Sequence, residues 1–336
     1  MAGISPSILH FHITSRCPHY CRHCCSDSGP ERTCAELDGK AIRRMLDRAA
    51  RFGMEEFELS GGEPLVVGRN RILEGIGYAS SLGLLTTLNT NAWYLDEGYI
   101  LDLKDAGLDR VKSSLYGTSC ITHDDFTQKQ GSFKRVKDVL GLLRENEIEV
   151  WINYVVTPRN IDEASGLPRL LVPYTVDTIQ LSSIVPSGRG EGARDYVFSD
   201  GELRNVTERL EGVFPNAKGS TVSYTITLWK DPEKYPFGDR YCDYLRDRLV
   251  VDPSGHVIPC CVLPSRLKSR AGNIVEEELD GFLAAERLED KPVFYWLGRG
   301  HKAMRERLQR EGGSSNLCSS CIKMLTTLCN NGNGNV

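Results

Sequence analysis

The sequence lacks the features that mark nucleic-acid-binding proteins and membrane proteins. Its 336 residues carry a net charge of only −4, and they contain no block rich in Lys or Arg that would favour nucleic acid or an anionic membrane as a partner. No apolar run approaches the length of a membrane span, and the N-terminus has no basic region followed by the apolar stretch of a secretion signal. We therefore expect a cytoplasmic protein that has neither nucleic acid nor a membrane as a partner.

Cysteine, by contrast, is abundant: the chain has twelve, and most of them fall in three groups. Four lie within residues 17–25, two are adjacent at Cys260 and Cys261, and three lie within residues 318–329. Disulfides are rare in a reducing compartment, and cysteines that only filled a core would be scattered. The grouping therefore indicates metal binding or thiol chemistry.

Hydrophobic periodicity predicts strands and helices in regular alternation over the first 190 residues. Strands are expected at residues 8–13, 56–60, 84–89, 110–114, 149–156 and 178–184, and helices at about 37–52, 69–82, 96–106, 133–145 and 162–171. Such alternation favours parallel strands with right-handed crossovers, and six units are too few for a closed eight-stranded barrel. The predicted fold class is therefore α/β, with a partial, TIM-like (β/α)6 barrel as its core.

Past residue 190 the alternation ends, and this change predicts how the chain is divided. We expect the barrel core at residues 1–190, a linker and substrate-capping segment at 191–240, a small α+β extension at 241–329 and a disordered tail at 330–336. Within these segments the sequence predicts a helix near residues 200–210 and a strand at 221–228. It also predicts a β-hairpin with a Pro-Ser-Gly turn at 249–258.

Two motifs that follow predicted strands carry the chemistry. Cys17, Cys21 and Cys24 lie on one loop after the first strand, and three thiols leave one of the four ligand positions of a metal centre open. Gly61-Gly62-Glu63-Pro64 follows the second strand. Both motifs fall at the C-terminal ends of strands, where barrel enzymes build their active sites. Taken alone, the three thiols fit either an iron–sulfur cluster or zinc.

In this order and at this separation, the two motifs resemble those of the radical S-adenosylmethionine (SAM) superfamily. The resemblance implies that Cys17, Cys21 and Cys24 hold a [4Fe-4S] cluster whose open iron is chelated by SAM, and that Glu63 contacts the amino group of SAM. It also implies an electron donor of the flavodoxin or ferredoxin type. Relatives commonly carry a SAM-binding Arg where Asp125 stands in this chain. Further SAM contacts are expected from Gly61, Gly62, Pro64, His23 (stacked on adenine), Ser114, Asn153 and Arg189.

A second set of cysteines supplies the four thiols of a closed site. Its members, from two distant segments, are Cys242, Cys260, Cys318 and Cys321. The pattern resembles the twitch extension of radical SAM enzymes, a short form of the SPASM domain, and implies one auxiliary [4Fe-4S] cluster. A zinc ribbon is the alternative. Cys329 is the one remaining downstream cysteine, too few for the full SPASM pattern.

Cys261, which follows the expected cluster ligand Cys260, bears on which reaction the enzyme catalyses. Neighbouring side chains in an extended segment point to opposite faces, so Cys261 is expected to be a free thiol beside the auxiliary cluster. This arrangement resembles the radical SAM epimerases, in which a 5′-deoxyadenosyl radical removes a hydrogen atom and a Cys thiol returns one from the opposite side. The alternatives are that Cys261 is a small buried residue or an alternative ligand of the cluster. The rival thiols are Cys25, Cys34, Cys120 and Cys329.

The sequence-based hypothesis for the substrate is a cationic aminoglycoside. The Cys motif begins at residue 17, which leaves no room before it for a peptide-recognition domain and favours a small molecule. Carboxylates on predicted loops are candidates to bind it: Glu36, Asp124, Asp125, Glu191 and Asp195. The alternatives are a sugar or aminocyclitol dehydrogenase with the auxiliary cluster as electron acceptor, a peptide epimerase or other peptide-modifying enzyme, and a non-enzymatic zinc-binding protein.

Overall fold

The computed structural model describes residues 6–185, 187–214, 222–227, 247–261 and 271–284. Within these ranges the strands are β1 (Ile8–His12), β2 (Glu56–Ser60), β3 (Leu85–Thr90), β4 (Arg110–Leu115), β5 (Glu149–Val156), β6 (Thr178–Ser183), β7 (Ser223–Thr227), β8 (Arg248–Val251) and β9 (Val257–Ile258).

The helices alternate with the first six strands. They are α1 (Gly39–Phe52), α2 (Arg69–Ser81), α3 (Glu97–Asp105), α4 (Cys120–Thr127), α5 (Ser132–Glu145), α6 (Ile161–Ala164), α7 (Leu167–Leu171), α8 (Asp200–Val213) and α10 (Leu279–Leu283), with short 3-10 turns η1 (Pro64–Val67), η2 (Val172–Tyr174), η3 (Gly188–Gly192) and η4 (Arg194–Tyr196). Side-chain caps start several of them; Asp38, for example, accepts a hydrogen bond from the backbone N–H of Ala41. Among the described helices, none is both long and apolar enough to cross a membrane.

One curved sheet organises the chain, in the strand order β7-β6-β5-β4-β3-β2-β1-β8-β9. Neighbouring strands from β7 to β8 run parallel, and β8 and β9 form the expected antiparallel hairpin. The predicted α/β fold with a partial barrel is therefore confirmed. The sheet also extends past the six predicted units, because β7 pairs with β6 and β8 pairs with β1.

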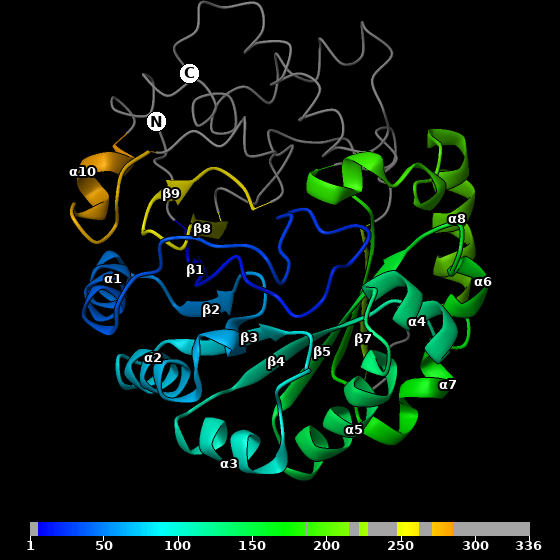
Figure 1. Ribbon diagram of the computed structural model, residues 1–336, viewed down its shortest axis with the longest axis horizontal. Helices are drawn as coiled ribbons and strands as arrows, with labels where there is room; N and C mark the ends of the chain where they lie inside the picture. Colours follow the sequence, from blue (N-terminus) through cyan, green and yellow to red (C-terminus); the bar gives the residue numbers. More distant parts are fainter. Residues whose placement is uncertain (1–5, 186, 215–221, 228–246, 262–270, 285–336) are drawn as a thin grey trace, which may run out of the picture.

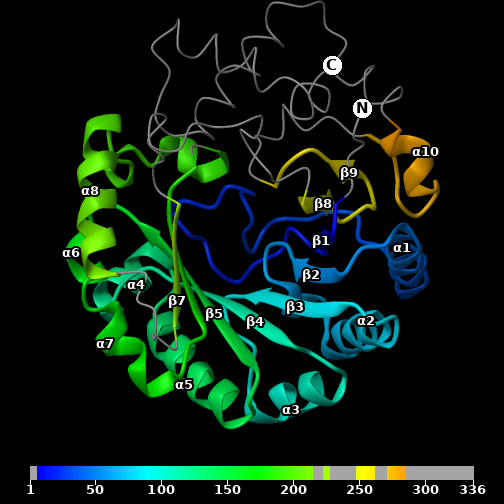
Figure 2. The same ribbon diagram turned by 180° about the vertical axis from the view of Figure 1, so that it is seen from behind.

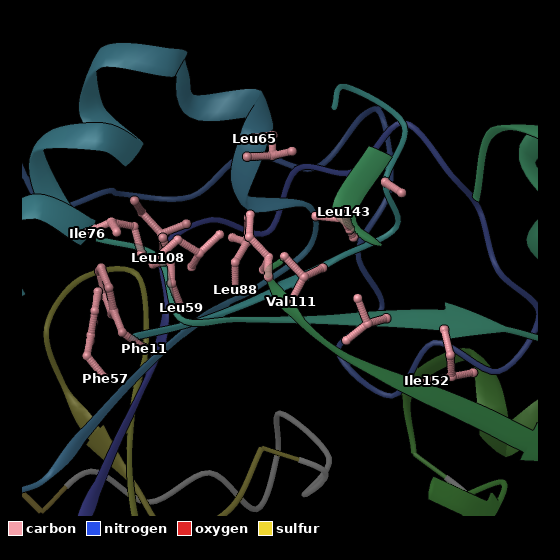
Figure 3. Packing of buried hydrophobic residues seen from close by; sticks show 14 of the residues in the cluster. Phe11, Phe57, Leu59, Leu65, Ile76, Leu88, Leu108, Val111, Leu143 and Ile152 are labelled. Atoms are coloured by element: carbon pink, nitrogen blue, oxygen red, sulfur yellow. The ribbon is translucent and has the colours of Figure 1, made fainter. Parts of the chain in front are cut away.

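The outer face of the sheet is apolar and carries the core. Figures 1 and 2 show the helices as an arc outside the sheet, with α1, α2, α3 and α5 following one another around it. Side chains alternate between the two faces of a strand, so every second residue is buried against these helices. Figure 3 shows part of this packing, in which outward-facing residues of four strands and of the helical layer meet: Phe11, Phe57, Leu59, Leu88, Val111 and Ile76.

The inner face, in contrast, is polar and holds a buried ion network. The Glu58 carboxylate accepts from Lys112 Nζ at 2.9 Å, and it also pairs with Arg248. Burial disfavours ionisation of Glu58, but the surrounding His10, Lys112 and Arg248 outweigh it and hold the pKa of that carboxyl well below its usual range. Burial in turn lowers the pKa of His10 to about 4, so its ring is neutral at neutral pH. The inner face is thus a charge-paired layer that does not resemble the apolar filling of many barrels.

Removing one member of this network should destabilise the fold. Lys112→Met leaves the buried Glu58 carboxylate short of a partner, and we expect a loss of about 3 kcal/mol in the free energy of unfolding, measured by urea denaturation. Lys104→Met is the matched control. Lys104 makes only a surface ion pair of 3.9 Å with Glu147, so its loss should cost about 0–1 kcal/mol. Equal losses in the two variants would contradict this reading.

Candidate functional site

The loop that carries the first three cysteines is joined to the Gly-Gly-Glu loop by backbone pairing. The Gly62 N–H donates to the Thr14 carbonyl at 2.7 Å, and the Glu63 N–H donates to the Arg16 carbonyl at 2.8 Å. A Cβ atom on Gly62 would lie 2.2 Å from the Arg16 carbonyl oxygen. Gly61 has a φ of 140°, and its Cβ would lie 2.5 Å from the Thr14 oxygen. The two glycines are therefore required for the approach of one loop to the other.

The same cysteine loop is fastened to α4 on another side. The Tyr20 and Arg22 N–H groups donate to the carbonyls of Thr127 and Phe126, at 3.2 and 3.1 Å. The Arg22 guanidinium also donates to the Asp125 carboxylate at 2.7 Å. Asp125 thus anchors the cysteine loop.

Arg189, expected to contact SAM, holds the loop from a third side. From η3, its guanidinium donates to the Cys21 carbonyl at 2.8 Å, to Asp27 Oδ1 at 2.9 Å and to the Ser28 carbonyl at 2.6 Å. It also lies 4.0 Å from the centre of the Tyr20 ring. In this structure the contacts of Arg189 are those of a clamp on the cysteine loop.

The three thiols of the loop are suited to binding a metal centre. Cys17 is buried, and Cys21 and Cys24 are half-buried. Burial raises the pKa of the Cys17 thiol to about 12 and that of Cys21 further, with the neighbouring sulfurs adding to the effect. Buried thiolates that affect one another's ionisation are stable only when cations neutralise them, and iron does so in a cluster. The donor set therefore fits the cluster that the sequence motif implies.

Glu63 lies at the centre of the rim and is fully buried. Its Oε1 accepts from the Thr90 hydroxyl at 2.8 Å and from the Leu65 N–H at 3.1 Å, while Oε2 accepts from the Asn91 N–H at 2.7 Å. Burial raises the pKa of Glu63 to about 7, against the effect of these bonds. The neighbouring Pro64 is buried and begins η1. The carboxyl is thus held rigidly and is poised between its neutral and ionised forms.

Aromatic rings stack beside the third cysteine. The His23 ring lies 4.9 Å from the centre of the Tyr116 ring and 4.8 Å from that of Phe126, and the two latter rings stack at 4.5 Å. Burial lowers the pKa of His23 to about 3, so a neutral ring takes part in this stack. The Tyr116 hydroxyl hydrogen-bonds Ser114 and lies close enough to the three cysteine sulfurs to be affected by their charges.

A row of neutral polar residues crosses the inner face below this stack. In the strand register Asn153 of β5 stands between Ser114 of β4 and Gln180 of β6, and all three are half-buried. The structure thus brings the predicted SAM residues Ser114 and Asn153 together on neighbouring strands.

The carboxylates predicted to bind a cationic substrate have other partners. Glu36 accepts from the Thr14 hydroxyl at 2.6 Å and pairs with Arg16 and Arg71, each at 3.1 Å. Asp124 caps α5 by accepting from the Gly131 and Phe133 N–H groups.

The remaining two of these carboxylates lie on the surface. Asp195, on η4, is exposed and lies 3.5 Å from Arg159. Glu191 is an exposed residue of η3. The five predicted substrate carboxylates therefore do not form one anionic cluster.

Part of the second cysteine set lies in the described region. Cys260 and Cys261 follow β9 after Pro259 and are half-buried, and Cys260 packs against the main core. Cys242, Cys318, Cys321 and Cys329 lie outside the described residues.

Sequence reasoning missed two residues at the rim. Asn91 follows β3, and its side-chain amide lies 3.6 Å from Cys17 Sγ. Tyr116, at the end of β4, lies near all three sulfurs. Both follow strands at the end where barrel enzymes carry their sites, and that position was the available signal.

Comparisons with known families and structures agree with this geometry. Residues 11–169 match the Radical SAM superfamily, and residues 242–322 match the SPASM family, an iron-sulfur cluster-binding domain. Streptococcus suis SuiB bound to S-adenosylmethionine superposes with a TM-score of 0.68 at 15% identity, over 85% of this chain and 68% of SuiB. Native anSMEcpe with bound AdoMet gives 0.68 at 16% identity, over 85% of this chain and 82% of that one. At these identities the likeness shows the fold.

Curated relatives are more similar in sequence. The PqqA peptide cyclase of Rhodopseudomonas palustris is 27% identical over 77% of this chain and 67% of its own length. The AdoMet-dependent heme synthase of Methanosarcina barkeri is 29% identical over 59% of this chain and 56% of its own length.

The contact between the two loops can be tested at Gly62. Gly62→Ala places a methyl group against the Arg16 carbonyl, so we expect a loss of about 1–3 kcal/mol in unfolding free energy and less iron retained per chain after reconstitution. Gly141→Ala, in α5 with open space around it, should instead gain about 0.5–1 kcal/mol and keep its iron. Full iron content and unchanged stability in Gly62→Ala would argue against the proposed packing.

The family matches place the two cysteine sets in two cluster-binding domains, and the described geometry of the first set fits a cluster. The cofactors are accordingly SAM, the [4Fe-4S] cluster that binds it and an auxiliary iron–sulfur cluster. The chain is a radical SAM enzyme that carries a C-terminal SPASM domain.

Proposed function

We propose that this enzyme modifies a peptide and that the predicted aminoglycoside is not its substrate. The relative that aligns with 77% of the chain is named for a peptide substrate, and the epimerisation of an aminoglycoside finds no support in the relatives described above. The observation that carries the proposal within this chain is the way its carboxylates are already paired.

An aminoglycoside carries several positive charges, so its binding site requires carboxylates that are not already paired within the protein. Glu36 forms ion pairs with two arginines, and Asp125 forms one with Arg22. Asp124 accepts hydrogen bonds from backbone N–H groups. On the inner face of the sheet, three carboxylates are matched by three cations: Glu56, Glu58 and Glu149 by Arg110, Lys112 and Arg248. A substrate with several positive charges would have to compete for each of these partners.

The neutral row on the inner face suits a different ligand. Ser114, Asn153 and Gln180 offer both hydrogen-bond donors and acceptors without charge. Peptide N–H and C=O groups need such partners when they are buried, because an unpaired amide group in a dry site is costly. This match supports a peptide backbone as the substrate.

The rim residues have distinct tasks in this proposal. Cys17, Cys21 and Cys24 hold the cluster, Glu63 receives the amino group of SAM, and the neutral ring of His23 stacks on its adenine. When bound, the cluster and SAM supply the one-electron chemistry that removes a hydrogen atom from carbon. Arg189 and Asp125 keep the cysteine loop in place around them.

Cys261 remains our proposed hydrogen donor. It follows β9, which pairs antiparallel with β8, and β8 lies beside β1 in the barrel sheet. An S–H group there can transfer its hydrogen atom to a carbon radical of the peptide, which forms a C–H bond and leaves a sulfur radical. One electron from the flavodoxin- or ferredoxin-type donor and one proton then restore the thiol. This sequence inverts a stereocentre without net oxidation.

The substrate class can be tested with two panels of candidates. The reconstituted enzyme is incubated anaerobically in D2O with SAM, dithionite and either a panel of short synthetic peptides or a set of aminoglycosides. We expect 5′-deoxyadenosine to form at least about tenfold faster with a peptide than with any aminoglycoside, and that peptide to change in mass. Stimulation by an aminoglycoside alone would overturn the proposal.

The same reaction separates the roles of Cys261. A peptide that is one deuterium heavier with the wild type and unchanged with Cys261→Ala identifies the thiol as the hydrogen donor. A peptide two mass units lighter with both enzymes shows an oxidation and excludes Cys261 from that role. Cys34→Ala is the control thiol variant and should behave as wild type.

The pKa of Glu63, raised to about 7 by burial, predicts a pH dependence of SAM binding. Below this pH the carboxyl is neutral, and above it the carboxylate attracts the ammonium group of SAM. The affinity should therefore rise by about tenfold between about pH 6 and about pH 8, as followed by equilibrium dialysis. Glu63→Gln should bind weakly and show no such rise. An affinity that falls with pH in the wild type would contradict the role of Glu63.

A further inference from the structure

Asn91 connects three parts of the rim through its three polar groups. Its backbone N–H donates to Glu63 Oε2 at 2.7 Å, its side-chain Oδ1 accepts from the Trp93 N–H at 3.0 Å, and its side-chain Nδ2 lies 3.6 Å from Cys17 Sγ. The Trp93 N–H can only donate, so the atom that receives it must be the amide oxygen. The NH2 group of Asn91 is therefore the one that faces the sulfur.

The position of this amide is fixed by its surroundings. Glu63, which holds the Asn91 backbone, is fully buried and is itself held by the Thr90 hydroxyl at 2.8 Å. The following residue, Ala92, is buried and has a left-handed φ of 64°. A loop so constrained keeps the distance between the amide and the sulfur.

We propose that Asn91 is a positioning residue that sets the reduction potential of the SAM-binding cluster by donating a hydrogen bond to the sulfur of Cys17. Hydrogen bonds to the sulfurs are among the factors that fix the potential of an iron–sulfur cluster. The reduced cluster carries one more negative charge than the oxidised one, so a donor at the sulfur stabilises the reduced form more. Asn91 therefore raises the potential and makes the cluster easier to reduce. This inference does not depend on the identity of the substrate.

Asn91 differs from the other groups around the cysteine sulfurs. The Ser28 N–H and the Ser26 hydroxyl, 3.3 and 3.4 Å from Cys24 Sγ, belong to the cysteine loop itself and move with it. Asn91 comes from the end of β3, 74 residues away from Cys17 in the chain. Its hydrogen bond therefore reports whether the cysteine loop is seated on the barrel rim, and it links that seating to the position of Glu63.

The test is an anaerobic redox titration of the reconstituted holoenzyme, followed by electron paramagnetic resonance. The signal of the SAM-binding cluster is identified as the one that changes when SAM is added. Asn91→Ser is short enough to lose contact with the sulfur, while its hydroxyl can still accept from the Trp93 N–H. Asn91→Asp keeps the size of the side chain and the oxygen that accepts from the Trp93 N–H. Its second carboxylate oxygen, an acceptor, replaces the NH2 donor that faces the sulfur. Trp93→Phe alters the same loop and leaves the amide of Asn91 in place.

We expect a more negative midpoint potential in Asn91→Ser, a larger negative shift in Asn91→Asp and the wild-type potential in Trp93→Phe. Iron content and melting temperature are measured for each variant. If one of the two Asn91 variants loses iron, the potential of the other Asn91 variant is compared with that of the wild type. A wild-type potential in an Asn91 variant that retains its iron would overturn the proposal. An equal shift in Trp93→Phe would overturn it too, because disturbance of the loop would then account for the change.

Discussion

The site depends on two backbone hydrogen bonds between neighbouring loops. Gly62 and Glu63 donate to the carbonyls of Thr14 and Arg16, and this pairing continues β1 and β2 past the end of the sheet. It brings the cysteine loop and the Glu63 carboxyl to the same rim. The contact is possible only because residues 61 and 62 have no side chains to collide with the carbonyl oxygens. The two glycines therefore allow the two loops of the protein to pack together. This packing in turn places the groups that bind the cofactor.

Ion pairs hold the cysteine loop and the inner face of the sheet in place. Arg22 pairs with Asp125, and Arg189 pairs with Asp27, and both ion pairs hold the cysteine loop. Within the sheet, the ion network around Glu58 fills the space below the rim with matched charges. As a result, the carboxylates that the sequence offers for a cationic substrate are already engaged. These ion pairs support the proposal of a substrate without several positive charges.

The sequence predicts the fold better than it predicts the site. Strong periodicity marked β1 to β6 and the long helices, and glycine marked the end of α1 at Gly53. Helix α4 was not predicted, because its eight residues have little apolar periodicity and depend on the Ser119 cap and on contacts with the cysteine loop. The pairing of β8 with β1 joins residues about 240 positions apart, and no local pattern indicates such a contact.

The roles of charged residues were the hardest to predict for the same reason. Asp125 was a candidate for the substrate, yet its partner Arg22 lies 103 residues earlier in the chain. Arg189 was expected at the cofactor, and its contacts are with the backbone of the cysteine loop. The three cysteines of the first cluster, in contrast, lie close together in the sequence on one loop. Their spacing alone was therefore enough to propose them as ligands.

Cys17, Cys21 and Cys24 are assigned as the ligands of a cluster that binds SAM at an open iron. The electron paramagnetic resonance spectrum of the reduced, reconstituted protein, recorded with and without SAM, tests this assignment. The wild type should show a signal that changes when SAM is added. The triple variant Cys17→Ala, Cys21→Ala, Cys24→Ala should lose about four irons per chain and keep only a signal that does not respond to SAM. A SAM-responsive signal that survives in the triple variant would show that these three cysteines do not hold the SAM-binding cluster.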